Sequence, residues 1–487
     1  MQQSLSGKGS DFFLKRIKEE MNKWWKKGIL QMQTPPEWGV EPVPVKNRIL
    51  GFWDYLILWG DLGIGLLVLL AGSFLVPGLG FNDAIQVIIL GSLIGAGLLS
   101  VVGLMGSKVS VPTMVLLRPV LGLRGSILPS VINVIQLIGW TIFEFVIMGF
   151  AADAIFKNLF GFSNLYLWTA LFAVVVIIMG LGGPLGVVRE WLKKIAVWIV
   201  LVTSIWLTWH LLSSYDLSRI LTQTGDGSIP FWVAVDLVIS MPVSWLPLVA
   251  DYNRFAKKPA PAFWGTFAGY ALSNIWFYLL GVIILMAASF SQEPKEFVQA
   301  VVMTAGWIAF LVLLLDETDN AWADLYSSTV SIQNVLPKIN QRWLIIGLGI
   351  CSFIAAVLID ITRYESFLLL TGSLLIPLFG AAVADYFIIN RQHYYGEDLF
   401  KTQGRYWYTG GINLVGIIAW LLGIVLFQVT NPATLGGFFP AWMEMIPSWM
   451  TGLGGSIPSF LGAFIIYALL TWLVKTIHPV AFSSKME

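Results

Sequence analysis

The residues best suited to do chemistry are acidic side chains inside long apolar stretches of the sequence. Glu144 lies in one such stretch, and a second contains Asp316, Glu317, Asp319 and Asp324. A charged side chain at the centre of a bilayer costs at least ~2.5–3.5 kcal/mol, and it therefore usually marks the site or route of a polar solute. The acids predict a polar site inside a membrane protein, and transport is the first function to consider.

Polar and aromatic residues share a helix face with Glu144. Asn133, Gln136, Trp140 and Glu144 follow one another at intervals of three, four and four residues. At 3.6 residues per turn, this spacing keeps all four within about 80° of one face. A face of this composition is unsuited to lipid, so it predicts one wall of the polar site.

A later apolar stretch supplies a second polar face. Its members recur at helical spacing, with Glu317 and Asp319 on the flanks: Asp316, Asn320, Asp324, Ser327 and Ser331. Carboxylates at such positions either contact a solute or bridge helices through hydrogen bonds. For Asp324 both roles stay open, whereas Glu144 and Asp319 are interpreted as site residues. Asp236 and Asp385 lie nearer the ends of apolar stretches, where an interfacial role is more usual.

The elements that must position these residues are membrane-spanning helices. The chain is 57% hydrophobic and only 12% charged, against ~25% charged residues in soluble domains. Twelve apolar stretches are long enough to cross a bilayer: 52–76, 84–106, 127–153, 166–183, 195–212, 231–250, 262–287, 306–333, 343–359, 365–389, 406–429 and 457–474. The sequence therefore predicts an all-α integral membrane protein with 12 transmembrane helices.

The distribution of basic residues predicts how the chain is oriented. Successive connections between the twelve stretches must lie on opposite sides of the membrane. One side has nearly all of the 29 Lys and Arg residues, and the other has only four: Lys157, Arg219, Lys295 and Arg363. Basic residues accumulate on the cytoplasmic side of a membrane protein. Both termini are therefore predicted to be cytoplasmic, in a multi-pass protein of the cell membrane.

The N-terminal segment 1–47 is too polar to be a signal peptide. Aromatic and aliphatic residues recur between 12 and 25 beside lysines and an arginine, which suits an interfacial helix on an anionic leaflet. A solvated helix or a loose tail is the alternative. Prolines between 35 and 44 prevent helix formation there, so the chain is expected to run extended into the first span.

Two spans contain residues that interrupt a helix. The first has three glycines between 60 and 65, and the sixth has Pro242 and Pro247. Close helix packing is the alternative explanation for glycines, and it is preferred for Gly91 and Gly95 in the second span. Breaks at corresponding places of two five-span halves point to inverted repeats around a midplane site. The predicted divisions are 1–47, 48–225 (spans 1–5), 226–390 (spans 6–10) and 391–487 (spans 11–12).

Several function classes are disfavoured by what the sequence lacks. It has one cysteine and three widely separated histidines, and its only Gly-Lys pair, at residues 7 and 8, is not part of a phosphate-binding loop. Neither a resident metal nor a cofactor is predicted, and no nucleic acid or ATPase subunit is expected as a partner. An integral-membrane enzyme and a passive channel both rank low. The expected source of energy is a co-transported ion.

The order of several short motifs resembles the nucleobase-cation symporter family of cytosine, purine, allantoin and hydantoin permeases. The resemblance extends from about Pro42 to the twelfth span. Its motifs are Leu-Arg-Pro-Val-Leu-Gly-Leu-Arg-Gly-Ser at 117–126, Gly139-Trp140, Ser244-Trp245, Ala-Asp-Tyr-Asn-Arg-Phe at 250–255, Thr-Asp-Asn-Ala at 318–321 and Gly-Gly-Ile-Asn at 410–413. The resemblance implies a leucine-transporter-type fold with a 5+5 inverted repeat, two C-terminal helices and alternating access.

The resemblance also implies the roles of individual residues. A heterocycle would be held between Trp140 and Trp245, with Glu144 at its edge and Gln136, Asp319 and Asn320 completing the substrate site. In sodium-coupled relatives the ion lies between carbonyl groups of the first break and hydroxyl groups of span 8. Those places correspond here to Gly60, Gly63, Asp316 and Glu317. Carboxylates in place of hydroxyls leave both Na⁺ and H⁺ open as the coupling ion.

Glu144 narrows the class of substrate. An amide presents a donor beside an acceptor, which matches the NH and C=O of uracil or hydantoin, whereas a carboxylate only accepts. We therefore expect an amino-substituted heterocycle: cytosine, an aminopurine or a hydroxymethylpyrimidine. An amino-acid symporter on the same fold is the alternative. Asp61, in the first break, argues against it because a carboxylate there would repel the carboxylate of an amino acid.

Overall fold

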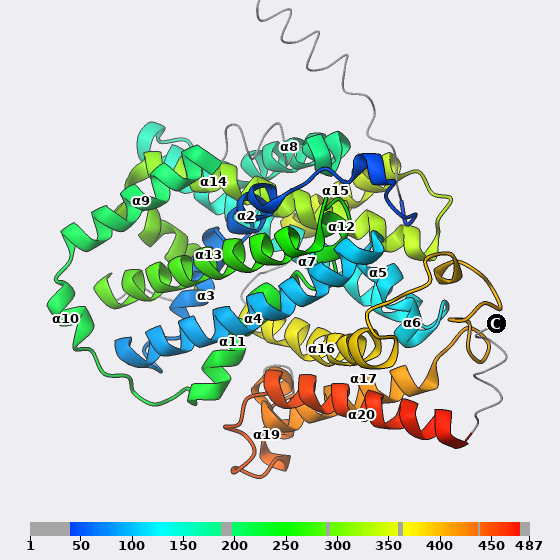
Figure 1. Ribbon diagram of the computed structural model, residues 1–487. Helices are drawn as coiled ribbons and strands as arrows, with labels where there is room; N and C mark the ends of the chain where they lie inside the picture. Colours follow the sequence, from blue (N-terminus) through cyan, green and yellow to red (C-terminus); the bar gives the residue numbers. More distant parts are fainter. Residues whose placement is uncertain (1–38, 187–196, 289–292, 359–363, 437–438, 478–487) are drawn as a thin grey trace, which may run out of the picture.

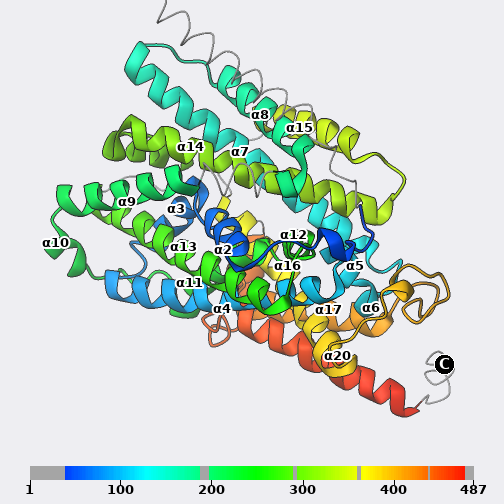
Figure 2. The same cartoon turned by 45° about the horizontal axis from the view of Figure 1, so that its top comes forward.

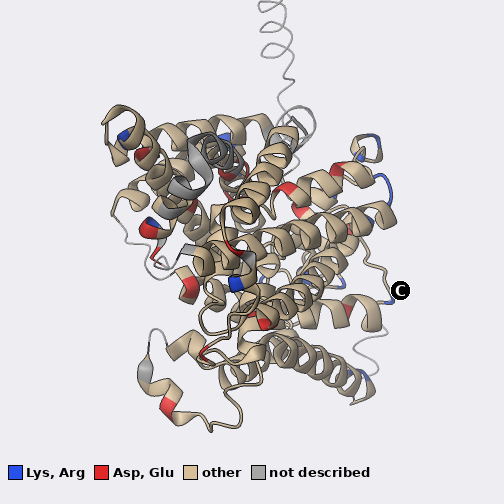
Figure 3. Cartoon of the chain, turned by 90° about the vertical axis from the view of Figure 1, so that its left-hand side faces the viewer, with Lys and Arg blue, Asp and Glu red and all other residues tan. Residues whose placement is uncertain are grey.

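The computed structural model describes residues 39–186, 197–288, 293–358, 364–436 and 439–477. The interfacial helix expected near the N-terminus lies outside these ranges. The regular structure within them is helical (Figure 1). Figure 3 shows most of the helical ribbon in the colour of uncharged residues, as expected for helices that are surrounded by lipid.

Each of the twelve predicted stretches overlaps one long helix or a pair of consecutive helices. In chain order these are α2 (Phe52–Asp61) with α3 (Leu66–Ser73), α4 (Phe81–Val109), α7 (Ile127–Phe160), α8 (Leu165–Gly186), α9 (Val197–Ser214), α11 (Phe231–Ser244) with α12 (Val249–Asn253), α13 (Pro259–Ala288), α14 (Pro294–Val335), α15 (Gln341–Leu358), α16 (Tyr364–Ala384), α17 (Leu414–Thr430) and α20 (Ser456–Ile477). Within the described residues, seven helices are long and apolar enough to cross a membrane, or eight if the bent pair α2 and α3 is one span. The count of twelve spans stays a prediction.

The helices of the two predicted halves pack against their counterparts. The second predicted span, α4, packs along the seventh, α13, and the third, α7, packs along the eighth, α14. The fourth, α8, packs against the ninth, α15, in the same way. Figure 2 shows α7 and α14 side by side, with α2 and α3 between this pair and α13. Helices α17 and α20 pack on α16 as an additional layer. The exact boundaries of the halves stay a prediction.

Glycines allow the central helices to approach closely. Gly91 and Gly95 of α4 face Val238 and Pro242 of α11, which confirms their interpretation as packing residues. On α13, a Cβ added to Gly281 would overlap the carbonyl oxygen of Leu69 in α3. Because that oxygen belongs to the backbone, it cannot move away as a flexible side chain would.

Replacing Gly281 by alanine is therefore expected to destabilise the protein by about 1–3 kcal/mol, the usual cost of overpacking a well-packed core. Thermal unfolding in detergent measures this effect. Gly97→Ala is the matched control, because Gly97 lies within α4 and a Cβ there meets no heavy atom within 4 Å. Alanine favours helix over glycine, so the control should be neutral or stabilising. Equal melting temperatures for both variants would show that α3 and α13 tolerate separation.

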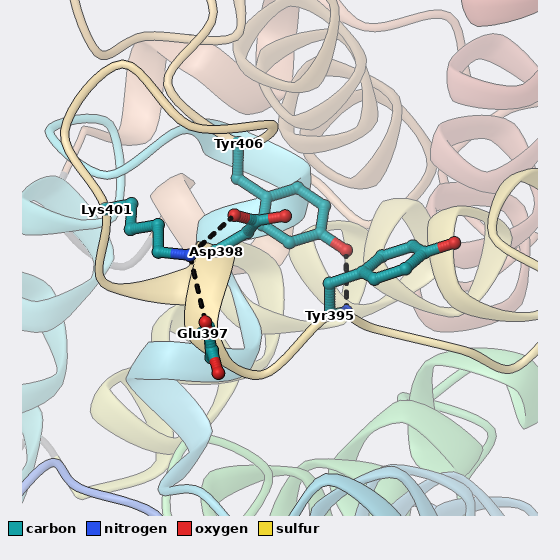
Figure 4. Close-up of polar contacts among 5 residues, drawn as sticks. All are labelled: Tyr395, Glu397, Asp398, Lys401 and Tyr406. Carbon is teal, nitrogen blue, oxygen red and sulfur yellow. Dashed lines mark hydrogen bonds and ion pairs between the residues drawn. The ribbon is translucent and has the colours of Figure 1, made fainter. Parts of the chain in front are cut away.

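The connection between α16 and α17 is a folded structure at the surface. Figure 4 shows the ion pair between Lys401 and Glu397 and the contact between Tyr406 and Tyr395. Lys401 Nζ lies 3.0 Å from Glu397 Oε2, and the hydroxyl of Tyr406 accepts a hydrogen bond from the backbone N–H of Tyr395 at 3.1 Å. The bond with Lys401 lowers the pKa of Glu397. Exposed ion pairs of this kind add little stability, so deeper contacts must hold the connection in place.

Arg118 supplies such a contact and explains part of the motif at 117–126. It belongs to the short helix α6 (Arg118–Leu121) in the connection between α4 and α7, and it is buried. Its guanidinium donates to the carbonyl of Leu399 at 2.8 Å and to Oδ1 of Asn334 at 2.7 Å. Burial lowers the pKa of Arg118 to about 10, which leaves it charged at neutral pH. Arg118 thus joins the connection between α4 and α7 to the end of α14 and to the connection between α16 and α17.

Two acids near helix ends have structural roles. Asp236 of α11 accepts hydrogen bonds from the backbone N–H groups of Gly455 and Ser456, at the start of α20, and from Asn431. Asp385 accepts from the hydroxyls of Tyr394 and Tyr467, each at 2.6 Å. A carboxylate at a helix N-terminus satisfies backbone donors that have no partner within the helix. Both acids are buried and join neighbouring elements, whereas an interfacial role was expected for them.

Candidate functional site

The two interrupted spans are broken where the glycines and prolines predict. Helix α2 ends at Asp61 and α3 begins at Leu66, and the two axes differ by 60°. Gly65 has a φ of 150°, which a residue with a side chain rarely adopts. Helix α11 ends at Ser244, four residues before α12. Irregular backbone at this depth is tolerated where it lines a cavity or is buried in protein.

A cavity lies beside both breaks. Helices α7 and α14 supply the acids of its wall, while the breaks supply mainly apolar groups. The lining residues are Leu62, Gly65, Leu67, Val68, Trp140, Glu144, Met241, Ser244, Trp245, Glu317, Asn320 and Asp324.

The polar face of α7 is a chain of hydrogen bonds that leads to the cavity. Asn133 donates to the hydroxyl of Ser331 at 2.7 Å, and Gln136 donates to Asn133 Oδ1 at 2.8 Å. The indole N–H of Trp140 donates to Gln136 Oε1 at 3.0 Å. Gln136 also donates to the carbonyl of Ser244 at 3.2 Å. The amide of Gln136 thus fixes Trp140 and satisfies a carbonyl at the break in span 6.

Aromatic side chains hold both cavity tryptophans in place. The edge of Trp140 packs against Tyr364 and Phe367 of α16, with ring centroids 5.7 and 5.2 Å apart. Trp245 packs against Trp59 of α2 at 6.2 Å, with the ring planes inclined by 80°. Trp140 and Trp245 are only 5% and 7% exposed. Ring orientations fixed in this way suit a flat ligand that stacks on them.

Glu317 links α14 to the break in span 1. Its Oε1 accepts hydrogen bonds from the backbone N–H groups of Leu66 and Leu67, the first residues of α3. The N-terminal end of a helix favours negative charge because its N–H groups point outward. The carboxyl group of Glu317 also lies beside that of Glu144. The acids of α7 and α14 therefore meet at the cavity wall.

Asn320 completes the contact between α14 and the first break. Its side-chain N–H donates to the carbonyl of Ile64 at 3.1 Å. Glu317 and Asn320 thus satisfy donors and an acceptor that the helix break leaves without helical partners. Together these two residues hold the backbone of residues 64–67 against α14.

The structure brings together four of the six predicted substrate residues: Trp140, Glu144, Trp245 and Asn320 line the cavity. Gln136 lies behind Trp140, and Asp319 is buried in α14 without lining the cavity. The roles of all six in binding stay predictions.

The predicted cation residues are less closely grouped. Gly60 approaches Gly269 of α13, and Gly63 approaches Ser273 on the same helix. The side chain of Asp316 lies outside the described part of the chain. Glu317 does line the cavity, but it contacts the N–H groups of α3 and Glu144. The roles of these residues in binding a cation stay predictions.

The structure adds to the sequence-based interpretation of two acids on α14. Glu317 was expected on the flank of the polar face, yet it lies at the cavity with Asn320 and Asp324. Asp324, for which two roles were open, is also a lining residue. Residues 317, 320 and 324 are spaced by three and four, as residues on one helix face should be. This spacing was the signal in the sequence that could have identified the cavity-facing side of α14. Asp316 obscured it, because residues 316, 320 and 324 are spaced just as regularly.

Comparisons with known proteins agree with this architecture. A hydantoin permease of Microbacterium maritypicum is 23% identical over 443 residues, which cover 86% of this chain and 89% of the relative. A cytosine permease of Escherichia coli K12 is 24% identical over 371 residues, covering 75% and 84%. The solved structure of Mhp1, a nucleobase-cation-symport-1 family transporter in a closed conformation with bromovinylhydantoin bound, superposes with a TM-score of 0.75 at 19% identity, covering 92% of this chain and 97% of Mhp1.

The fold expected from the sequence is therefore confirmed at the level of its architecture: an all-helical membrane protein like Mhp1. The relatives are permeases rather than enzymes. A family model described as permeases for cytosine/purines, uracil, thiamine and allantoin matches residues 42–449. This match covers most of the 487 residues, and it agrees with the broken spans and the central cavity. The chain is a multi-pass membrane protein that belongs to this family of permeases.

Proposed function

We propose that this chain is a symporter that imports an amino-substituted heterocycle together with Na⁺ or H⁺ by alternating access. Cytosine, an aminopurine and a hydroxymethylpyrimidine are the proposed substrates. We further propose that it lies in the cell membrane with both termini in the cytoplasm, as the distribution of Lys and Arg predicts. The cavity between Trp140 and Trp245, with an acidic wall, is the observation that carries the proposal.

The chemistry of the wall supports an amino-substituted ring. Glu144 and Asp324 present carboxyl oxygens, and a carboxylate offers acceptors only. Exocyclic amino groups and ring N–H groups are the donors that such a wall can satisfy. When a carboxyl is protonated, it can give one hydrogen bond to a ring nitrogen and accept one from the neighbouring amino group. Both protonation states therefore suit aminopyrimidines better than imides.

Amino-acid transport, the alternative on this fold, is disfavoured by the start of α3. Broken helices can bind a substrate carboxylate through the free N–H groups at a helix N-terminus. Here the N–H groups of Leu66 and Leu67 already donate to Glu317. A substrate carboxylate would have to displace Glu317 and would then lie beside a buried acid.

Counterflow in proteoliposomes tests the proposed substrate class. Vesicles preloaded with unlabelled cytosine should accumulate labelled cytosine, and adenine or a hydroxymethylpyrimidine should compete for this uptake. Uracil, hydantoin, allantoin and phenylalanine should compete less well. Vesicles without protein give the background. Counterflow of phenylalanine but not of any heterocycle would assign the chain to amino-acid transport instead.

The coupling ion is tested by separating the two gradients. An inward Na⁺ gradient at fixed pH is expected to drive more uptake than an inward proton gradient without Na⁺. The reason is that residues 62–65 lie between α2 and α3, and a break of this kind offers carbonyl oxygens that can hold a cation but not a proton. The opposite result would identify H⁺ as the coupling ion and make Asp316 and Glu317 the candidates for carrying it.

A further inference from the structure

The ionisable groups of the cavity are all acidic. Glu144, Glu317 and Asp324 line it, and they are 4%, 0% and 3% exposed. No Lys, Arg or His is among the described residues that line it. Burying several ionised carboxylates in an apolar interior is costly unless they take up protons or positive charge accompanies them. The wall is therefore electrostatically suited to a ligand that brings positive charge.

Asp324 differs from the other two acids in its surroundings. Glu317 accepts hydrogen bonds from the start of α3 and lies beside Glu144. Asp324 accepts no hydrogen bond from any residue in the part of the chain that the structure describes, although it lines the cavity and is 3% exposed. A buried polar group without a partner is expensive. Its carboxyl oxygens therefore face the cavity, where a ligand can supply donors.

The remaining walls of the cavity also suit a cation. The faces of tryptophan rings attract positive charge, most strongly where water is excluded, and both Trp140 and Trp245 line the cavity. Within the described residues, no three His, Cys, Asp or Glu side chains converge closely enough to hold a metal ion. Acids spread around a wall match a flat organic cation, whose charge and N–H donors are spread over a ring.

We propose that the heterocycle bound in this cavity carries a positive charge and that Asp324 is its counter-ion. The inference rests on the proposed function, because it specifies the charge of the heterocycle taken up at the same site. Glu144 then accepts from N–H groups at the ring edge, and the tryptophans contact the charged ring. Glu317 holds the start of α3 and Glu144 in place, and it does not itself contact the charged heterocycle.

A pair of isosteric probes tests the charge of the ligand. Binding of 4-amino-1-methylpyridinium, a permanent cation, is compared with binding of 4-methylaniline, its neutral isostere, by calorimetry on the purified full chain. The cation should bind at least about tenfold more tightly, since both cation–π attraction and the buried counter-ion favour it. Equal binding, or tighter binding of the neutral probe, would overturn the proposal.

Substitution of the counter-ion provides the second arm. Asp324→Asn preserves size and should lower affinity for the cation at least about tenfold while leaving affinity for the neutral probe unchanged. Asp153→Asn is the control, because Asp153 lies on α7 beyond Glu144 and is paired with the hydroxyl of Ser163 rather than lining the cavity. An unchanged cation preference in Asp324→Asn would remove Asp324 from this role. If the variant does not fold, the probe comparison on the unmodified chain still decides the charge of the ligand.

Cytosine, included as a third ligand, separates this proposal from the proposed function. If cytosine binds and the protein shows no preference for the cationic probe over the neutral probe, the proposed heterocycle symporter stands and only the proposal of a charged ligand is overturned. Failure of cytosine and of both probes to bind would overturn both proposals.

Discussion

Replacing Trp140 or Trp245 by alanine is expected to weaken binding of the heterocycle by about ten- to a hundredfold. Both tryptophans line the cavity and are almost completely buried. Stacking of a base on an aromatic side chain contributes roughly 1–3 kcal/mol in nucleic-acid sites, and each 1.4 kcal/mol corresponds to a factor of ten in affinity. The planes of the neighbouring Tyr364 and Phe367 are inclined to that of Trp140 by 81° and 71°, so these rings do not offer a parallel surface in its place.

Equilibrium binding of labelled cytosine to purified protein measures this effect. Trp264→Ala is the matched control, because Trp264 lies on α13, is 58% exposed and does not line the cavity. Thermal unfolding of each variant establishes that it is folded. Unchanged affinity in folded Trp140→Ala would exclude the α7 face from the site, and the same result for Trp245→Ala would exclude the break in span 6.

Replacing Glu144 by glutamine is expected to reverse the preference between amino-substituted and imide rings. Glutamine keeps the size of the side chain but introduces a donor beside an acceptor. Affinity for cytosine should fall by about 1–3 kcal/mol, the cost of leaving a buried polar group unpaired. Relative affinity for uracil, which offers NH beside C=O, should rise. Because glutamine can still donate to Glu317, the contact between α7 and α14 can persist.

The ratio of cytosine to uracil affinity is the quantity to measure, because a general loss of stability would lower both affinities together. Asp153→Asn, on the same helix, again serves as the control. If the ratio is the same in the original chain and in Glu144→Gln, Glu144 does not recognise the hydrogen-bonding groups at the edge of the ring. Its contact with Glu317 would then be its main role, as a bridge between helices or as a carrier of protons.

The sequence alone determined the elements of this protein and the places where they break. Apolar runs of sufficient length define helices in lipid because no other open structure satisfies the backbone there. Pro242 and the glycines near residue 63 predicted the two interruptions, since proline and glycine act on their own backbone. The spacing of Gln136, Trp140 and Glu144 placed them on one face for an equally local reason. The order of the motifs then indicated the family.

Only the tertiary structure decided which residues face the cavity. Adjacent helical residues differ by about 100° in direction, so Asp316 and Glu317 belong to different faces, and their sequence does not say which face turns inward. The rotation of α14 is set by its packing along α7 and against α3, and it brings Glu317 to the N–H groups of Leu66 and Leu67. The same packing leaves Asp324 facing the cavity. These outcomes depend on contacts between residues more than a hundred positions apart, and local spacing carries no information about such contacts.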